Sequence, residues 1–377
     1  MRQSGPVTHA RSVAIAFVTL IAAGCAPTAS SPTPTASPSA SATTSPLASS
    51  SATPSAPPRL KPSDAPLTEV AGAFVLFQVA GETRLRAISF DAEMNGVLGD
   101  EVAAGSVWSQ SPFGISYVIG STAYDRNAKV LGTVPWDARQ TATWSSDGRF
   151  LCAAVPDRAT TGAQMRLETA VIGQPAKIIA SGFMTYADNG SYRVLACDQA
   201  SDRAVVASFG QGVAPARLVV FRLSTGAIIR SVDYAGAVGW VAASADASTL
   251  AESVRQSPSG KWIATIRATD DGSQLGVVED FVVRGFSGDK SLVVGPSGSA
   301  TPARSSLTTA VIEWKTGRTV WSAGDHPYGG FLAEPAGRRL VVGIGFVGGS
   351  DVRDVYLVSP DGSAVLLPAQ VRVALLY

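Results

Sequence analysis

A short pattern recurs along the chain from about residue 69 to the C-terminus at residue 377. Each copy has an apolar or aromatic residue, then a turn of small and polar residues, then an apolar run. The clearest copies are Trp144–Cys152 (WSSDGRFLC), Ser257–Thr265 (SPSGKWIAT), Gly285–Val293 (GFSGDKSLV) and Ala333–Val341 (AEPAGRRLV), and Trp108–Gly114 (WSQSPFG) is a weaker one. A chain that repeats one small unit buries its apolar surface by stacking copies of that unit, so a repeat architecture is expected.

The runs between these turns have the composition of β-strands. Ala73–Val79 (AFVLFQV), Leu218–Leu223 (LVVFRL) and Leu340–Ile344 are rich in Val, Leu, Ile and Phe and are bounded by turn-forming residues. No amphipathic helix pattern stands out. A spacing of about 35–50 residues with about four strands in each unit is that of one β-propeller blade. The predicted fold class is therefore all-β, a β-propeller.

We predict seven four-stranded blades, at residues of about 70–104, 105–136, 141–181, 191–235, 238–280, 281–324 and 327–369. The first blade lacks an innermost strand, whereas Val371–Tyr377 (VRVALLY) is strand-like and has no blade of its own. The C-terminal strand is therefore expected to pair into the first blade beside Ala73–Val79. This pairing would close the ring and remove exposed sheet edges.

The turns resemble those of the bacterial TolB-type, WD40-like propellers, whose blades carry Ser-Pro-Asp-Gly between the first and second strands. The complete motif occurs here once, at Ser359–Gly362, and the other copies are degenerate. The resemblance covers about 300 residues. It implies the architecture and no particular activity, because propellers carry many functions.

The N-terminus has the layout of a secretory signal. Arg2 and Arg11 precede the apolar run Ser12–Ala23, which is shorter than the roughly 20 residues of a membrane-spanning helix. Ala22–Cys25 (AAGC) resembles the lipobox of bacterial lipoproteins, although Ala22 stands where Leu is usual. The resemblance implies a signal peptide over residues 1–24 and acylation of Cys25, for example by palmitate. The alternative is an ordinary cleaved signal with an incidental cysteine.

Residues 26–66 consist almost entirely of Ser, Thr, Pro and Ala. Such a segment buries too little apolar surface to offset its ordering entropy. We interpret residues 25–66 as the lipidated Cys25 and a disordered tether, and residues 67–377 as the propeller domain. At about 3.1 Å per residue in polyproline II, such a tether would reach on the order of 100 Å from the membrane.

The cysteine count predicts a disulfide. If Cys25 is acylated, Cys152 and Cys197 remain, and an even remainder in an exported protein favours a bridge. The alternative is two buried free thiols. The net charge of +1 lacks the basic excess that a nucleic-acid partner needs.

Few residues suit catalysis or metal binding. His326 is the only histidine left once His9 leaves with the signal. A zinc site built from several histidines therefore cannot form, and a Ser-His-Asp triad would depend on His326 alone. Asp91–Gly96 (DAEMNG) resembles the opening of a calcium loop, but Val102 stands where the closing Glu belongs, and a hairpin turn accounts for the same residues. We therefore expect no cofactor and no metal ion.

The predicted function is non-catalytic. Trp136, in a loop-like VPWDA segment, and His326, in a turn-rich loop, are the candidate exposed ligand contacts. We expect a monomeric lipoprotein at the outer face of the cytoplasmic membrane, whose propeller binds or scaffolds an envelope protein, peptide or glycan. The alternative is a glycan-directed hydrolase with carboxylates in the central pocket. Its candidate acids show no pair spacing and are Glu168, Glu252, Glu279, Glu313 and Glu334.

Overall fold

A computed structural model describes most of the chain after residue 55. The described ranges are 56–67, 72–101, 108–111, 116–125, 127–136, 142–157, 164–185, 191–209, 214–234, 238–256, 260–298, 308–324, 326–345 and 354–373. The signal peptide, Cys25 and the tether up to residue 55 lie outside them. The chain divides into two units, residues 1–54 and Ser55–Tyr377, and the described residues all belong to the second. Within the described ranges, no helix is long and apolar enough to cross a membrane.

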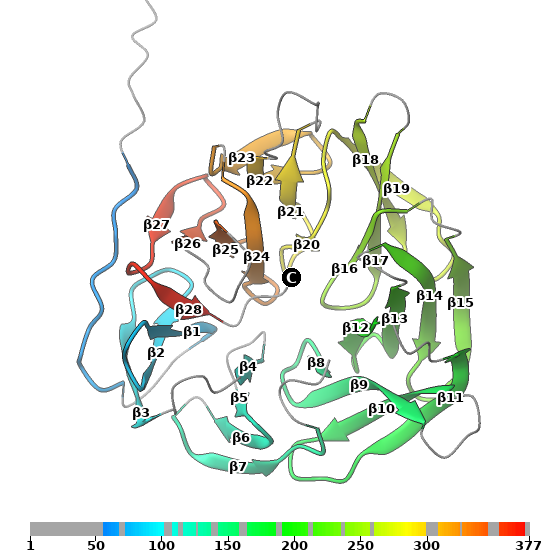
Figure 1. The fold of residues 1–377 in the computed structure, drawn as a ribbon, viewed down its shortest axis with the longest axis horizontal. Coiled ribbons are helices and arrows are strands. Elements are labelled where there is room, and N and C mark those ends of the chain that lie inside the picture. The colour runs from blue at the N-terminus through cyan, green and yellow to red at the C-terminus, as the bar shows by residue number, and fades with distance from the viewer. Residues whose placement is uncertain are drawn as a thin grey trace, which may run out of the picture. The chain divides into compact units, whose positions relative to one another are not determined.

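The second unit is a seven-bladed β-propeller, as the sequence predicts. Seven four-stranded antiparallel sheets form it, and they stand in a ring in Figure 1. Blade 1 contains β28 (Val371–Val373), β1 (Phe74–Val79), β2 (Arg84–Ser89) and β3 (Asn95–Glu101). Blade 2 contains β4 (Trp108–Gln110), β5 (Ser116–Ile119), β6 (Thr122–Asp125) and β7 (Val130–Thr133). Blade 3 contains β8 (Ala142–Trp144), β9 (Phe150–Asp157), β10 (Gln164–Val171) and β11 (Lys177–Thr185).

The remaining blades follow in chain order. Blade 4 contains β12 (Ser191–Asp198), β13 (Arg203–Phe209), β14 (Pro215–Arg222) and β15 (Ile228–Asp233). Blade 5 contains β16 (Trp240–Ala243), β17 (Thr249–Arg255), β18 (Trp262–Ala268) and β19 (Gln274–Glu279). Blade 6 contains β20 (Gly285–Phe286), β21 (Leu292–Ser297), β22 (Thr308–Glu313) and β23 (Arg318–Ser322). Blade 7 contains β24 (Tyr328–Ala333), β25 (Leu340–Ile344), β26 (Asp354–Val358) and β27 (Ala364–Leu366).

The ring closes as predicted. The C-terminal strand β28 pairs with β1 as the innermost strand of blade 1, with Phe77 opposite Val373 and Val79 opposite Val371. Val371 and Val373 are buried in a core that blades 1 and 7 share. Residues 374–377, the rest of the predicted strand, lie outside the described ranges. One blade limit is corrected, because β11 continues to Thr185 rather than ending at residue 181.

The core lies between neighbouring blades. Strands β1, β13 and β14 are buried along most of their length, because the blade before and the blade after each cover one face of the sheet. Blades 5 and 6 pack closely at Gly276, where an added Cβ would lie 2.6 Å from the ring of Trp314. Only glycine leaves room for the indole at this point. Four tryptophans are buried in these interfaces: Trp108, Trp144, Trp240 and Trp314.

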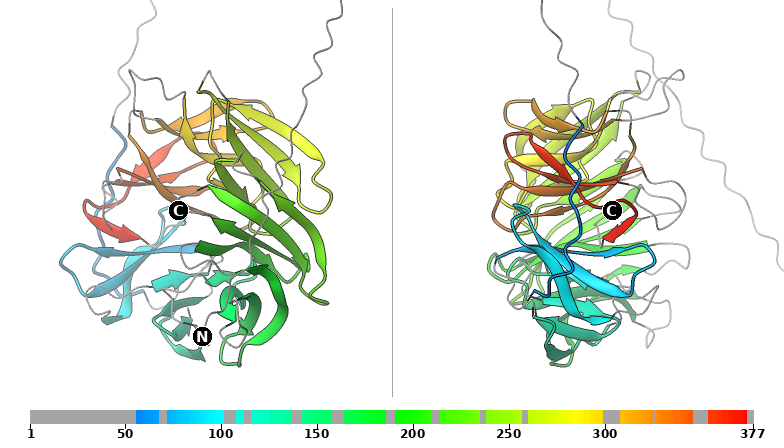
Figure 2. Two further views of the ribbon diagram at one scale, coloured as in Figure 1. Left: turned by 45° about the vertical axis from the view of Figure 1, so that its right-hand side comes forward. Right: turned by 90° about the vertical axis from the view of Figure 1, so that its left-hand side faces the viewer.

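The N-terminal boundary of the propeller is corrected by a segment that we call the strap, residues 56–67. Its Leu60 N donates to Leu366 O on β27 at 2.7 Å, and its Leu67 N donates to Val97 O on β3 at 2.9 Å. The strap therefore joins the outermost strands of blades 7 and 1. It is the blue segment that runs between them in Figure 1 and in the right-hand view of Figure 2. The unit begins at Ser55 and not after residue 66.

One buried arginine fixes the strap to blade 1. Arg86, on β2, donates to Ser63 O at 2.6 Å and to the Asp64 carboxylate at 2.8 Å. Its Nε also donates to Glu82 at 2.9 Å. These bonds, together with the packing of Leu60 and Leu67 against the neighbouring cores, order a segment whose composition indicates disorder.

Candidate functional site

The centre of the ring is surrounded by the innermost strand of each blade. Figure 1 places β28, β4, β8, β12, β16, β20 and β24 around the axis. Each of these strands is antiparallel to the second strand of its own blade. All seven therefore run in the same direction along the axis, with their first residues at one end and their last residues at the other. We call these the start end and the finish end. The two ends carry different chemistry.

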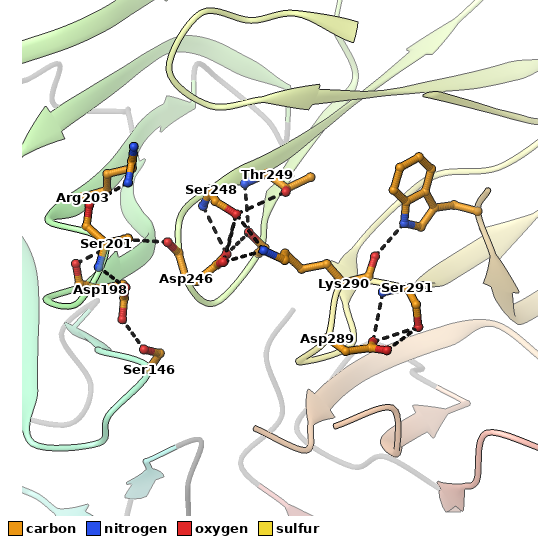
Figure 3. A network of polar contacts seen from close by, with 12 residues as sticks. Ser146, Asp198, Ser201, Arg203, Asp246, Ser248, Thr249, Asp289, Lys290 and Ser291 are labelled. Atoms are coloured by element: carbon orange, nitrogen blue, oxygen red, sulfur yellow. Dashed lines mark hydrogen bonds and ion pairs between the residues drawn. The ribbon is translucent and has the colours of Figure 1, made fainter. Parts of the chain in front are cut away.

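The finish end carries a network of polar side chains, shown in Figure 3. We call it the polar belt, and its members are Ser146, Asp198, Ser201, Asp246, Ser248, Asp289 and Lys290. Ser146 Oγ donates to Asp198, Ser201 Oγ donates to Asp246 O at 2.7 Å, and Lys290 Nζ donates to the Asp246 carboxylate at 2.7 Å. Each bond crosses from one blade to the next, from blade 3 to blade 6. The polar belt therefore ties neighbouring blades together.

The recurring turn supplies the carboxylates of the polar belt. In the turn after β16, Ser244 Oγ donates to Asp246 at 2.6 Å and accepts from Thr249 N at 3.0 Å. The turn after β20 repeats both bonds with Ser287, Asp289 and Leu292. Burial opposes ionisation of Asp246, but hydrogen bonds from Lys290 and Ser244 outweigh it and hold its pKa below the ordinary value. Asp246 is thus an ionised, fully engaged structural group.

Trp136 is not an exposed ligand contact, and this prediction is wrong. Its side chain is 4% exposed and packs with Val134, Trp144 and Leu151 between blades 2 and 3. Its indole Nε1 donates to Glu168 at 3.2 Å. The ring packs between the two blades because it buries more apolar area there than it would in an exposed loop.

His326 lies at the start end, two residues before Tyr328 begins β24, and it is exposed as expected. Its backbone oxygen accepts from Thr309 N at 3.2 Å and from Thr309 Oγ1 at 2.9 Å. These bonds fix the loop backbone and leave the imidazole at the surface. Nothing described assigns the imidazole a ligand.

The candidate acids do not converge. Glu252 accepts from Tyr234 Oη at 3.0 Å and from Arg267 Nε at 2.7 Å. The other paired glutamates are Glu168 with Arg166 at 2.9 Å, Glu313 with Arg338 at 2.9 Å and Glu334 with Arg339 at 3.2 Å. Glu279 lies on β19, the outermost strand of its blade. None of these side chains belongs to an innermost strand.

Asp91 belongs to a hairpin turn between β2 and β3. Its carboxylate accepts from Ser89 Oγ and from Glu93 N, the latter at 3.1 Å. Hydrogen bonding from Ser89 outweighs burial and lowers the pKa of Asp91. Across the described residues, no group of three or more His, Cys, Asp or Glu side chains is placed to hold a metal ion.

The start end carries three arginines that the sequence analysis did not single out. We call Arg193, Arg284 and Arg372 the arginine rim. Arg193 lies near the beginning of β12, Arg284 directly precedes β20, and Arg372 is the middle residue of β28. The sequence feature that could have indicated them is a single arginine among apolar residues at the start of an inner strand, as in YRV, VVRGF and VRV.

Aromatic rings support each rim arginine. The Arg284 guanidinium lies 3.5 Å from the centroid of Trp240 and 5.9 Å from that of Tyr328. Arg193 lies 5.6 Å from the centroid of Phe209, whose ring is 6.3 Å from that of Trp240. These contacts connect blades 4 to 7 at one end of the axis. Arg372 forms a separate pair, 4.7 Å from the centroid of Trp108.

The rim contains donors without acceptors. Among the described residues, no carboxylate forms an ion pair with a rim arginine. Arg284 Nε and the indole Nε1 atoms of Trp240 and Trp108 are enclosed without a hydrogen-bond partner. Burial lowers the pKa of Arg284 to about 10; Tyr328 counteracts this lowering and the charge of Arg193 adds to it. Arg284 therefore remains a cation at neutral pH in a place that disfavours charge.

Cys152 and Cys197 form a disulfide between blades 3 and 4. Cys152 lies on β9 and Cys197 on β12, and their Cα atoms are 6.1 Å apart. This separation is within the roughly 4.4–6.8 Å that disulfides require. Both side chains are buried in the core that the two blades share.

No protein-family model matches this chain, and no curated protein matches it. Solved structures do match. TolB from Acinetobacter baumannii is 12% identical, with 83% of this chain and 84% of that chain covered and a TM-score of 0.40. An oligogalacturonate lyase from Vibrio parahaemolyticus is 13% identical, with 78% and 85% covered and a TM-score of 0.47. A prolyl endopeptidase structure is 12% identical, with 80% and 49% covered and a TM-score of 0.52. At such identities the likeness is one of fold, and the chain is similar to β-propellers that include both enzymes and a TolB protein.

Proposed function

We propose that this protein is a non-catalytic binding module, held by a lipid on Cys25 at the outer face of the bacterial cytoplasmic membrane. It binds an envelope protein, peptide or glycan at the start end of its inner strands. The observation that carries this proposal is the arginine rim, where the described residues at the beginnings of the inner strands present cations on aromatic supports, while the one carboxylate of the inner strands, Asp198, lies at the finish end. Such an end suits recognition better than acid–base chemistry.

The rival proposal is a glycan hydrolase, and the placement of the acids disfavours it. Glycoside hydrolysis needs two carboxyl groups that face each other across the substrate, roughly 5–9.5 Å apart. Here Glu168 and Glu252 lie on strands away from the axis, and each is already bonded to an arginine and a second donor.

A sedimentation assay separates the two proposals. Purified protein is mixed with insoluble envelope material, and both bound protein and soluble sugar are measured over time. A binding module sediments with the material to saturation and releases nothing. Time-dependent release of soluble reducing ends, lost in Glu252→Gln or Glu168→Gln, would instead establish the hydrolase.

The anchor has its own test. Cys25→Ser removes the thiol that would carry the acyl chain, so the variant is expected to lose all label from a fatty-acid analogue and to leave the membrane fraction. Burial of lipid contributes about 0.8 kcal/mol per CH₂, which makes retention without it negligible. The Cys152→Ala/Cys197→Ala variant is the control, since it removes the two other cysteines together, leaves no new free thiol and should stay labelled. Equal labelling of wild type and Cys25→Ser would reject the anchor.

A further inference from the structure

The rim arginines are unusual within this molecule. Most described arginines that are partly buried have a carboxylate partner, such as Arg86 with Glu82 or Arg267 with Glu252. Of the described arginines without an ion pair, only Arg284 and Arg372 are partly buried, and both belong to the rim. Buried charges normally have partners, because an uncompensated one is unfavourable.

The aromatic supports leave only one kind of surface to a ligand. Trp240 is 8% exposed, Trp108 is 5% exposed and Phe209 is 4% exposed. These rings are therefore not platforms on which a sugar can stack. They cover one face of each guanidinium and fix its orientation, so a ligand meets the N–H groups at its edge. Such an edge matches the paired oxygens of a carboxylate or phosphate.

Two of these cations also act on each other. Arg193 and Arg284 are connected through Phe209 and Trp240, and their charges repel. An anion beside both would offset the repulsion and accept hydrogen bonds from guanidinium N–H groups that form no ion pair among the described residues. The same pattern, a guanidinium on a buried indole whose Nε1 lacks an acceptor, recurs at Arg372 and Trp108.

We propose that the arginine rim is an oxyanion site, at which Arg284 and Arg193 together bind a carboxylate or phosphate group of the ligand. This inference rests on the proposed function and gives the chemistry of its ligand. Arg284 supplies a pre-oriented donor edge, and Arg193, which is exposed at the start end, completes the charge.

The test uses the mature protein and isothermal titration at one fixed ionic strength. The probes are citrate, inorganic phosphate and a hexaglutamate peptide, which distinguish a free anion from acidic groups on a polypeptide. Arg284→Met and Arg193→Met are each expected to weaken binding at least tenfold. Arg284→Lys should fall between them and wild type, because an ammonium cannot bind in bidentate fashion. Arg149→Met is the matched control, since Arg149 is exposed at the finish end.

Thermal melting separates a ligand site from a structural role. Without ligand, Arg284→Met should melt at or above the wild-type temperature, because it removes an uncompensated cation. Citrate should raise the melting temperature of wild type and of Arg149→Met, and leave that of Arg284→Met unchanged. A loss of several degrees in unliganded Arg284→Met would assign the residue to the core and overturn the proposal.

Two further outcomes would overturn it: no saturable binding of any probe, or citrate affinity of Arg284→Met within twofold of wild type. The sedimentation assay keeps this result apart from the proposed function. Envelope binding that persists in Arg284→Met would reject the oxyanion site and leave the binding module intact. Arg284-dependent citrate binding together with release of soluble sugar would retain the site and reject the non-catalytic function.

Discussion

A chain that stops at Gln370 is expected to aggregate or to melt far below the full-length protein. The truncation removes β28, so Val371 and Val373 leave the core shared by blades 1 and 7, and β1 becomes an unpaired inner edge. Each large apolar side chain that loses full burial costs on the order of 1.5–3 kcal/mol. Together with the lost backbone pairing, this is comparable with the whole stability of a typical domain, about 5–15 kcal/mol.

Differential scanning calorimetry and size-exclusion chromatography measure this effect. The specific control is a synthetic peptide of residues 371–377 added in trans, which should restore the melting temperature of the truncated protein by filling the same edge. A peptide of the same composition in scrambled order should not restore it. A truncated protein that melts within a degree or two of wild type would show that the ring does not depend on β28.

Loss of the disulfide is expected to give the next largest effect. Cys152 and Cys197 are separated by 45 residues. For a loop of this length the chain-entropy model gives about 4 kcal/mol of stabilisation. The Cys152→Ala/Cys197→Ala variant should therefore melt roughly 6 °C lower than wild type, because the unfolding entropy is about 2.1 cal/mol/K per residue over a unit of about 320 residues.

Reducing agent provides the matched comparison. Dithiothreitol should lower the melting temperature of wild type towards that of the double variant and should not affect the double variant itself. If dithiothreitol changed neither the melting temperature of wild type nor its mobility on a non-reducing gel, the result would contradict a disulfide in solution.

The blades could be predicted because their defining turn is local. Ser244 and Asp246 close the turn with bonds to residues at most five positions away. The short sequence pattern therefore contains all the residues that fix the geometry of the turn. The missed end of blade 3 has a local cause as well. Gly182 suggests a turn, but it takes φ +74° within β11, where the register with β10 shifts as in a β-bulge, and the strand continues.

The arginine rim and the strap could not be predicted for the opposite reason. Arg193 and Arg284 are about ninety positions apart in the sequence, and only the closure of the ring brings their blades to one axis. The strap binds mainly through main-chain groups and two arginines, Arg59 and Arg86, and only Leu60 and Leu67 pack on the cores, so its Pro-rich composition gives little sign of its contacts. Trp136 was misjudged because a Pro-Trp-Asp segment resembles a loop, whereas packing between blades decides its burial.

The strap also determines how the ring responds to force. A pull applied at residue 56 first loads the bonds that Pro58 and Leu60 make with Leu366. We expect the bonds to blade 1 to break next, and β28, which closes the ring on its inner side, to be loaded only after the strap has detached. Under tension the strap should therefore detach from the outer strands first, while the inner strands of the ring keep their arrangement.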